Sequence, residues 1–177
     1  MPKNRKSIRL QSFDYSQPSL YYVTICTEHR GNILGFIHRG EMILNEYGRI
    51  AENEWLNTKI IRPNMDLDYF VIMPDHLHGI IIITDPRTGV SRYAPTNATT
   101  GTSMNQFRSP SQSLGAIIRG YKSTVTKQIN EMRKTPGLKF WQRNYYEHIV
   151  RNENDLYRIR KYIKQNPLKW EIQKESS

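Results

Sequence analysis

Two histidines separated by one residue are the first feature of this chain that could carry chemistry. His76, Leu77 and His78 open a run of aliphatic residues, 76–84, that predicts a β-strand. Because side chains alternate along a strand, both imidazoles are expected on one face, with Leu77 pointing into the core. Two neighbouring imidazoles can bind a divalent metal ion, and the same pattern is also compatible with hydrogen-bonded structural histidines. The helical His-Glu-x-x-His zinc-protease motif does not occur here.

Tyr162 and Asn166 form a second candidate pair, on a helix that is expected to begin after the N-cap Asn152 and to end near Asn166-Pro167. The predicted buried stripe of this helix consists of Leu156, Ile159 and Ile163. Tyr162 and Asn166 are four residues apart and therefore share one flank of that stripe. The tyrosine could also be plain packing, and the amide could be a helix C-terminal residue before Pro167. The spacing does not decide between these interpretations.

Tyr121 is the competing phenol. It lies in the middle of a predicted helix over 113–134, whose apolar stripe consists of Leu114, Ile117, Ile118, Tyr121, Val125, Ile129 and Met132. This position predicts a core tyrosine. The far face of the same helix is expected to carry Arg119, Lys127, Arg133 and Lys134.

The elements that must position these residues alternate between strands and helices. Strands are predicted at 20–27, 68–73, 76–84 and 145–150, and a further amphipathic helix at 45–60. Pro74-Asp75 suits a tight turn between antiparallel neighbours. The order describes an α+β fold with helices packed on a ferredoxin-like antiparallel sheet. Residues 85–112, of which 16 of 28 are Gly, Pro, Ser, Thr or Asn, are expected to form a flexible loop within a single domain 1–177.

The composition favours a polyanionic partner. Lysine and arginine number 26 against 16 acidic residues, for a net charge of +10. Apolar residues are 37% of the chain and no aliphatic run approaches the ~20 residues of a spanning helix, so no membrane span is expected. A single cysteine, Cys26, excludes an intramolecular disulfide and a multi-cysteine zinc site. The basic start has no apolar core typical of a secretion signal, so we expect a cytoplasmic protein.

The positive charge is concentrated in the C-terminal part of the chain. Residues 113–177 hold 14 lysines and arginines against 6 carboxylates. A solvent-exposed helix face is enough to account for the position of any single lysine. The excess of positive charge in residues 113–177 as a whole favours a phosphate-binding surface. The candidates for DNA contacts are Arg119, Lys127, Arg151, Lys161 and Lys164.

Several segments in one order resemble the HUH-type single-tyrosine transposases, and within them the REP-associated branch. These segments are Met73-Pro74-Asp75-His76-Leu77-His78-Gly79, Phe140-Trp141-Gln142, Tyr146-Glu147-His148, Arg151-Asn152 and 161–169, which reads KYIKQNPLK. The resemblance covers most of the chain except the basic N-terminus and residues 85–112.

The resemblance implies a role for each matching residue. His76 and His78 would be metal ligands, Tyr162 the nucleophile, and Asn166 the third ligand through its side-chain oxygen. Glu147 and His148 match a Glu-His pair of the family, and we give them at most a supporting role. The family acts on single-stranded or hairpin DNA, forms a 5′-phosphotyrosine intermediate and uses Mg²⁺ or Mn²⁺. Its members work as monomers or homodimers, and the sequence does not choose between these states.

This chemistry suits the residue types. A free phenol with a pKa near ~10 is about 0.1% ionised at neutral pH, so a divalent ion that polarises the phosphate lowers the cost of the attack. The phosphotyrosine bond conserves energy for strand joining, so no ATP site is needed. Two other readings remain open: a domesticated DNA-binding protein without transposition, and a metal-dependent phosphodiesterase that uses water.

Overall fold

The computed structural model describes residues 17–29, 31–85 and 113–175. The basic N-terminus and the predicted loop, apart from Asp85, lie outside the described residues. Four strands form the main sheet: β1 (Ser19–Cys26), β4 (Met65–Ile72), β5 (His76–Ile83) and β6 (Tyr146–Ile149). Their order is β4-β5-β1-β6 and all neighbours are antiparallel. This arrangement confirms the predicted α+β fold with a ferredoxin-like sheet.

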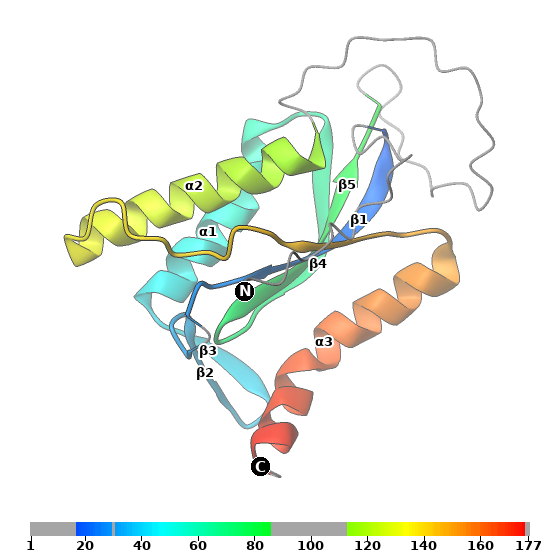
Figure 1. Cartoon of the computed structure of the whole chain (residues 1–177). Coiled ribbons are helices and arrows are strands. Elements are labelled where there is room, and N and C mark those ends of the chain that lie inside the picture. The colour runs from blue at the N-terminus through cyan, green and yellow to red at the C-terminus, as the bar shows by residue number, and fades with distance from the viewer. Residues whose placement is uncertain (1–16, 30, 86–112, 176–177) are drawn as a thin grey trace, which may run out of the picture.

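Helices cover both faces of this sheet (Figure 1). α1 (Glu46–Ile61) and α2 (Leu114–Arg133) pack on one face, where Trp55, Leu77, Tyr121 and Trp141 join the larger core cluster. α3 (Glu153–Glu175) packs on the other face against Tyr22, Ile80 and Val150. Different helices therefore pack on the two faces of the sheet, and the side chains at alternate positions of β5 face different helices.

Local sequence signals explain where α1 and α2 begin. The Asn45 side chain accepts a hydrogen bond from the Gly48 N–H at 2.9 Å, and Ser113 caps α2 through the Ala116 N–H at 3.3 Å. Behind the histidines, a Cβ on Gly79 would lie 2.4 Å from Trp55. Gly79 thus lets α1 approach the strand that carries His76 and His78.

The structure contains a hairpin that the sequence analysis missed. β2 (Gly35–His38) and β3 (Glu41–Leu44) pair outside the main sheet. Their two-residue turn, Arg39-Gly40, has φ values of 54° and 74°. Positive φ at both central residues matches the turn type that joins twisted two-residue hairpins.

The last helix is longer than predicted. We expected it to end near Asn166-Pro167, but α3 continues through the buried Pro167 to Glu175. Proline removes one backbone hydrogen bond and normally kinks or ends a helix. Here the turns beyond Pro167 contact other elements, because Trp170 packs on His76 and Glu171 binds the β2–β3 turn. Tertiary contacts therefore outweigh the local preference.

Two assignments on α2 also need correction. Met132, predicted in the apolar stripe, is 47% exposed. Arg133, predicted on the far face, is partly buried with its guanidinium over the rings of Tyr47 and Phe140, at 5.0 and 5.1 Å from their centroids. The favourable stacking of a guanidinium on two rings explains why the arginine turns inward. None of the described helices combines the length and apolar character required to cross a bilayer.

Candidate active site

The two histidines of β5 face α3, as the strand period predicted. Leu77 between them is fully buried on the opposite face. The Nε2 atoms of His76 and His78 lie 2.9 Å apart, and their ring centroids are 4.5 Å apart. The imidazoles thus converge on one point through the same ring nitrogen.

The other nitrogen of each ring is held by a neighbouring side chain. His78 Nδ1 lies 2.8 Å from the Tyr22 hydroxyl and 2.8 Å from Thr24 Oγ1. Thr24 is the β1 residue directly opposite His78 in the sheet. His76 Nδ1 contacts the Asp75 carboxylate. Partners at Nδ1 fix the orientation of an imidazole and leave Nε2 for another ligand, which is the usual arrangement around metal-binding histidines.

Burial keeps His78 neutral. Desolvation, with a smaller contribution from the charge of His76, lowers the pKa of His78 to about 3, although Asp75 acts in the opposite direction. At neutral pH the ring is therefore uncharged, and one of its two nitrogens keeps a free lone pair. A neutral imidazole is the form that binds a metal ion.

α3 brings Tyr162 and Trp170 into contact with the histidines. Tyr162, Asn166 and Trp170 follow one another at intervals of four residues. The Tyr162 ring centroid is 5.2 Å from that of His78, and its hydroxyl lies 3.5 Å from His78 Nε2. Trp170 packs on His76 with 5.6 Å between ring centroids. Asn166 lies between these two contacts and is only 7% exposed.

The donor set of these residues fits a divalent ion. Two ligand atoms at adjacent corners of an octahedron with bonds of ~2.1 Å are about 3.0 Å apart, close to the 2.9 Å between the histidine Nε2 atoms. Asn166 on the facing helix can add an amide oxygen. No group of three His, Cys, Asp or Glu side chains suited to a metal occurs among the described residues. Any metal held here would thus depend on the two imidazoles and on ligands of other types.

Tyr162 and Tyr121 occupy different environments. Tyr162 is 42% exposed, and Lys169 places its ammonium 5.9 Å from the Tyr162 ring centroid. Tyr121 is 2% exposed in the core, as predicted, and its hydroxyl donates to the Ala51 carbonyl at 3.2 Å. Burial raises the pKa of Tyr121 well above its usual value. Only Tyr162 combines access to solvent with contact to the histidines.

The C-terminal turns of α3 are fastened to the β2–β3 turn. The Glu171 carboxylate accepts hydrogen bonds from the N–H groups of Arg39 at 2.9 Å and Gly40 at 2.6 Å. Successive N–H groups in positive-φ backbone form a concave anion site, and here a carboxylate of the same chain fills it. Sequence reasoning missed both Glu171 and Trp170, because Pro167 predicted the end of the helix before them.

Glu147 and His148 point to opposite faces of the sheet. Glu147 pairs in register with Val23 of the α1–α2 core and is buried, so the structure does not bring it to the histidines. His148 pairs with Tyr22, and its Nε2 lies 2.8 Å from Oδ2 of Asp155 in the first turn of α3. His148 therefore helps to hold the start of α3 against β6.

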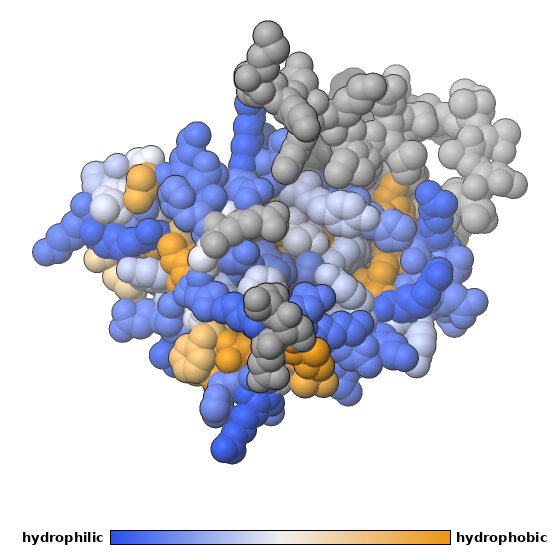
Figure 2. Space-filling view, turned by 60° about the horizontal axis from the view of Figure 1, so that its bottom comes forward, coloured by the Kyte–Doolittle hydropathy of each residue, from blue (hydrophilic) through white to orange (hydrophobic). Residues whose placement is uncertain are grey.

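The predicted DNA-contact residues separate into two groups. Arg119 and Lys127 lie on α2 beside a large cleft. Arg151, Lys161 and Lys164 are exposed on α3 or just before it. Figure 2 shows one face of the molecule, on which hydrophilic side chains prevail and hydrophobic ones form separate patches.

Comparisons with known proteins identify a relative of this chain. No family model matches it. A protein of Haemophilus influenzae described as uncharacterized is 37% identical over 168 residues, which are 95% of this chain and 91% of that protein. The chain belongs to the family of this Haemophilus protein.

The fold of the chain matches that of a solved structure. That structure is a REP-associated tyrosine transposase bound to a REP hairpin, with a TM-score of 0.56 and 16% identity over 93% of this chain and 74% of that one. The chain therefore shares the fold of that solved structure.

Proposed function

We propose that this chain is a DNA transposase that cleaves single-stranded or hairpin DNA through a 5′-phosphotyrosine intermediate on Tyr162. The observation that carries the proposal is the hydroxyl of Tyr162, a residue 42% exposed, 3.5 Å from Nε2 of His78 and beside a second converging imidazole. The fold shared with a REP-associated tyrosine transposase supports it.

His76, His78 and Asn166 would hold the Mg²⁺ or Mn²⁺ ion. When bound, this ion supplies Lewis-acid polarisation of the scissile phosphate. The imidazoles favour Mn²⁺ over Mg²⁺, because Mg²⁺ prefers oxygen ligands. The side chains at both Nδ1 atoms, Asp75 for His76 and Tyr22 with Thr24 for His78, would keep the rings oriented.

Tyr162 would act as the nucleophile. Its phenolic oxygen forms a bond to phosphorus while the bond from phosphorus to the 3′ oxygen breaks, which leaves a 3′-hydroxyl end and a tyrosyl phosphodiester. The phenol proton balances the charge on the departing 3′ oxygen. Lys169, whose ammonium lies 5.9 Å from the Tyr162 ring centroid, would stabilise negative charge on the phenol. Attack of a 3′-hydroxyl on the same phosphotyrosine reverses these steps and joins strands.

A denaturing gel tests the proposal. The protein is incubated with Mn²⁺ and labelled single-stranded and hairpin oligonucleotides from its own genomic flanks. We expect a covalent protein–DNA band that disappears in Tyr162→Phe. Tyr157→Phe is the matched control, because Tyr157 lies on the same helix and is 66% exposed.

The other outcomes identify the rival functions. Cleavage without a covalent band would indicate a phosphodiesterase that uses water. DNA binding without cleavage in either metal would indicate a DNA-binding protein that has lost transposition. Both results would contradict the proposed reaction.

A further inference from the structure

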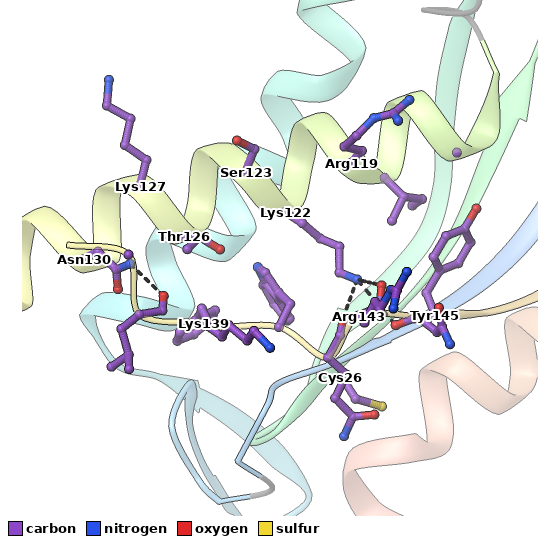
Figure 3. A pocket seen from close by; sticks show the side chains of 18 of the residues that line it. Cys26, Arg119, Lys122, Ser123, Thr126, Lys127, Asn130, Lys139, Arg143 and Tyr145 are labelled. Atoms are coloured by element: carbon purple, nitrogen blue, oxygen red, sulfur yellow. Dashed lines mark hydrogen bonds between the residues drawn. The ribbon is translucent and has the colours of Figure 1, made fainter. Parts of the chain in front are cut away.

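A second site lies outside the histidine–tyrosine cluster, in a cleft between α2 and the segment 136–146 (Figure 3). We name it the α2 cleft. Its volume of about 1690 Å³ exceeds the ~300–1,000 Å³ typical of small-molecule sites. On α2 its lining residues extend from Gly115 to Glu131, which is about 24 Å at ~1.5 Å per residue. These dimensions suit a segment of a polymer.

The charge of the α2 cleft suits a polyanion. Two carboxylates, Glu131 and Glu147, line it. Its cations are more numerous: Arg119, Lys122, Lys127, Lys134, Lys139 and Arg143. With the residues that the structure describes, Arg119, Lys134, Lys139 and Arg143 form no salt bridge. Cations that form no ion pair with the described residues can bind phosphates without first breaking such a pair.

One of these lysines holds the two walls together. Lys122 reaches from α2 across to the opposite segment, and its Nζ donates to the carbonyls of Gln142 at 2.6 Å and Arg143 at 3.2 Å (Figure 3). Asn130 makes a similar bridge, because its Nδ2 donates to the Leu138 carbonyl at 2.8 Å. The α2 cleft is therefore a braced feature of the fold, with its shape set before a ligand arrives.

Hydroxyl groups also line the cleft on α2. Ser123 and Thr126 line the cleft between Arg119 and Lys127, on successive turns of the helix (Figure 3). Hydroxyl and cationic side chains are the groups that contact phosphate and sugar oxygens in nucleic-acid complexes. The α2 wall thus offers both kinds of group to a nucleic-acid backbone.

Two of the residues that line the α2 cleft also contact side chains around the candidate active site. Thr24 lines the cleft and also contacts His78 Nδ1 at 2.8 Å. Tyr146 lines the cleft too, is 43% exposed, and packs edge-on against Tyr22 at 6.1 Å between ring centroids. Tyr22 in turn packs against Tyr162 at 6.3 Å. An exposed ring at this junction offers a stacking platform for an unpaired base.

We infer that the α2 cleft binds the single-stranded DNA segment that leads to the phosphate facing Tyr162. This inference rests on the proposed function and names the path of its substrate. Cations line the cleft on both walls, with Arg119 on α2 and Lys139 on the opposite segment, so a strand that follows the cleft can contact both. A duplex contacted only from its outside would use one wall and would leave Tyr146 without a base to stack on.

Affinity measurements on a cleavage-inactive background test the inference. In Tyr162→Phe protein, Arg119→Gln with Lys139→Gln removes one cation from each wall. The matched control is Arg49→Gln with Lys59→Gln, two cations of α1 that do not line the cleft. Fluorescence anisotropy then gives the affinity for an oligothymidylate, for a duplex of equal length and for an RNA oligomer, each as a function of salt.

The expected result is a loss of roughly tenfold in oligothymidylate affinity at 0.1 M salt for the cleft variant. Its log–log salt slope should become shallower by about 1.4, the value for two phosphate contacts on a single strand. The α1 control should change affinity less than twofold. A second measurement, photocrosslinking of a 5-iodouracil oligonucleotide, should label the peptide that contains Tyr146.

Three results would overturn the inference while leaving the proposed reaction intact. These are equal oligothymidylate affinity in the cleft and control variants, a loss confined to the duplex or to RNA, and crosslinks found only on α3 peptides. A different result, no salt-dependent binding of DNA by the Tyr162→Phe protein itself, would instead contradict the proposed function. Thermal melts of each variant show whether the exposed substitutions leave the fold intact.

Discussion

Removing the Glu171 carboxylate should release the C-terminal half of α3 from the β2–β3 turn. Glu171→Ala deletes two hydrogen bonds to a charged acceptor, from the N–H groups of Arg39 and Gly40. One of these bonds is exposed and the other partly buried, so we expect a loss of about 1–2 kcal/mol in the free energy of unfolding. For a chain of this size that corresponds to a melting temperature lower by roughly 2–8 °C.

The effect on cleavage should exceed the effect on binding. Glu171 lies next to Trp170, which packs on His76, and nine residues after Tyr162, so a looser α3 misplaces the phenol relative to the histidines. Small displacements of reacting groups cost large factors in rate, and we expect the cleavage rate to fall about tenfold or more at unchanged DNA affinity. Single-turnover cleavage with saturating oligonucleotide measures the rate, and anisotropy measures the affinity.

A graded series separates positioning from general destabilisation. Glu171→Gln keeps one acceptor oxygen and should recover part of the rate. Glu41→Ala, an exposed glutamate beside the same turn, is the control and should match the unmodified protein. If Glu171→Ala cleaves and melts like Glu41→Ala, the turn does not position α3 and the reasoning is refuted.

Further substitutions test the roles of the two histidines and of Tyr121, and the effect of the His78 pKa on stability. His76→Ala and His78→Ala should each abolish metal-dependent cleavage while most DNA binding remains; a large fall in melting temperature with cleavage retained would make them structural histidines. Tyr121→Phe should retain cleavage and lose ~1 kcal/mol of stability as its bond to Ala51 disappears; loss of the covalent product would contradict its core assignment. The pKa of His78 is lowered to about 3 in the folded chain, so between pH 7 and pH 5 the unfolded chain binds a proton at this residue that the folded chain does not. The free energy of unfolding should therefore fall from pH 7 to pH 5. This fall should be less steep in His78→Gln. Urea titrations at both pH values measure this, and equal slopes in the two proteins would contradict it.

Local periodicity was sufficient to predict the two halves of the candidate site. The two-residue strand period placed His76 and His78 on one face with Leu77 buried behind them. The helical period placed Tyr162 and Asn166 on one flank of α3. That α3 packs on the sheet face that carries the histidines depends on tertiary structure, and before the structure only the family resemblance indicated it.

The features that the sequence did not predict depend on contacts between distant residues. Tyr22 and Thr24 hold His78 because β1 pairs with β5 in one register, which no local pattern specifies. Trp170 and Glu171 belong to a helix that local rules end at Pro167. The four-residue strands of the β2–β3 hairpin are too short for a clear alternating pattern.

Mass-spectrometric mapping of the covalent product would identify the nucleophile directly. The protein is incubated with Mn²⁺ and a single-stranded oligonucleotide from its genomic flank, then digested with nuclease and protease. We expect one modified peptide, with the nucleotide attached to the Tyr162 oxygen through a 5′ phosphate. Attachment to any other residue, or a covalent product that persists in Tyr162→Phe, would contradict the assignment of the nucleophile and the role given to the histidines beside it.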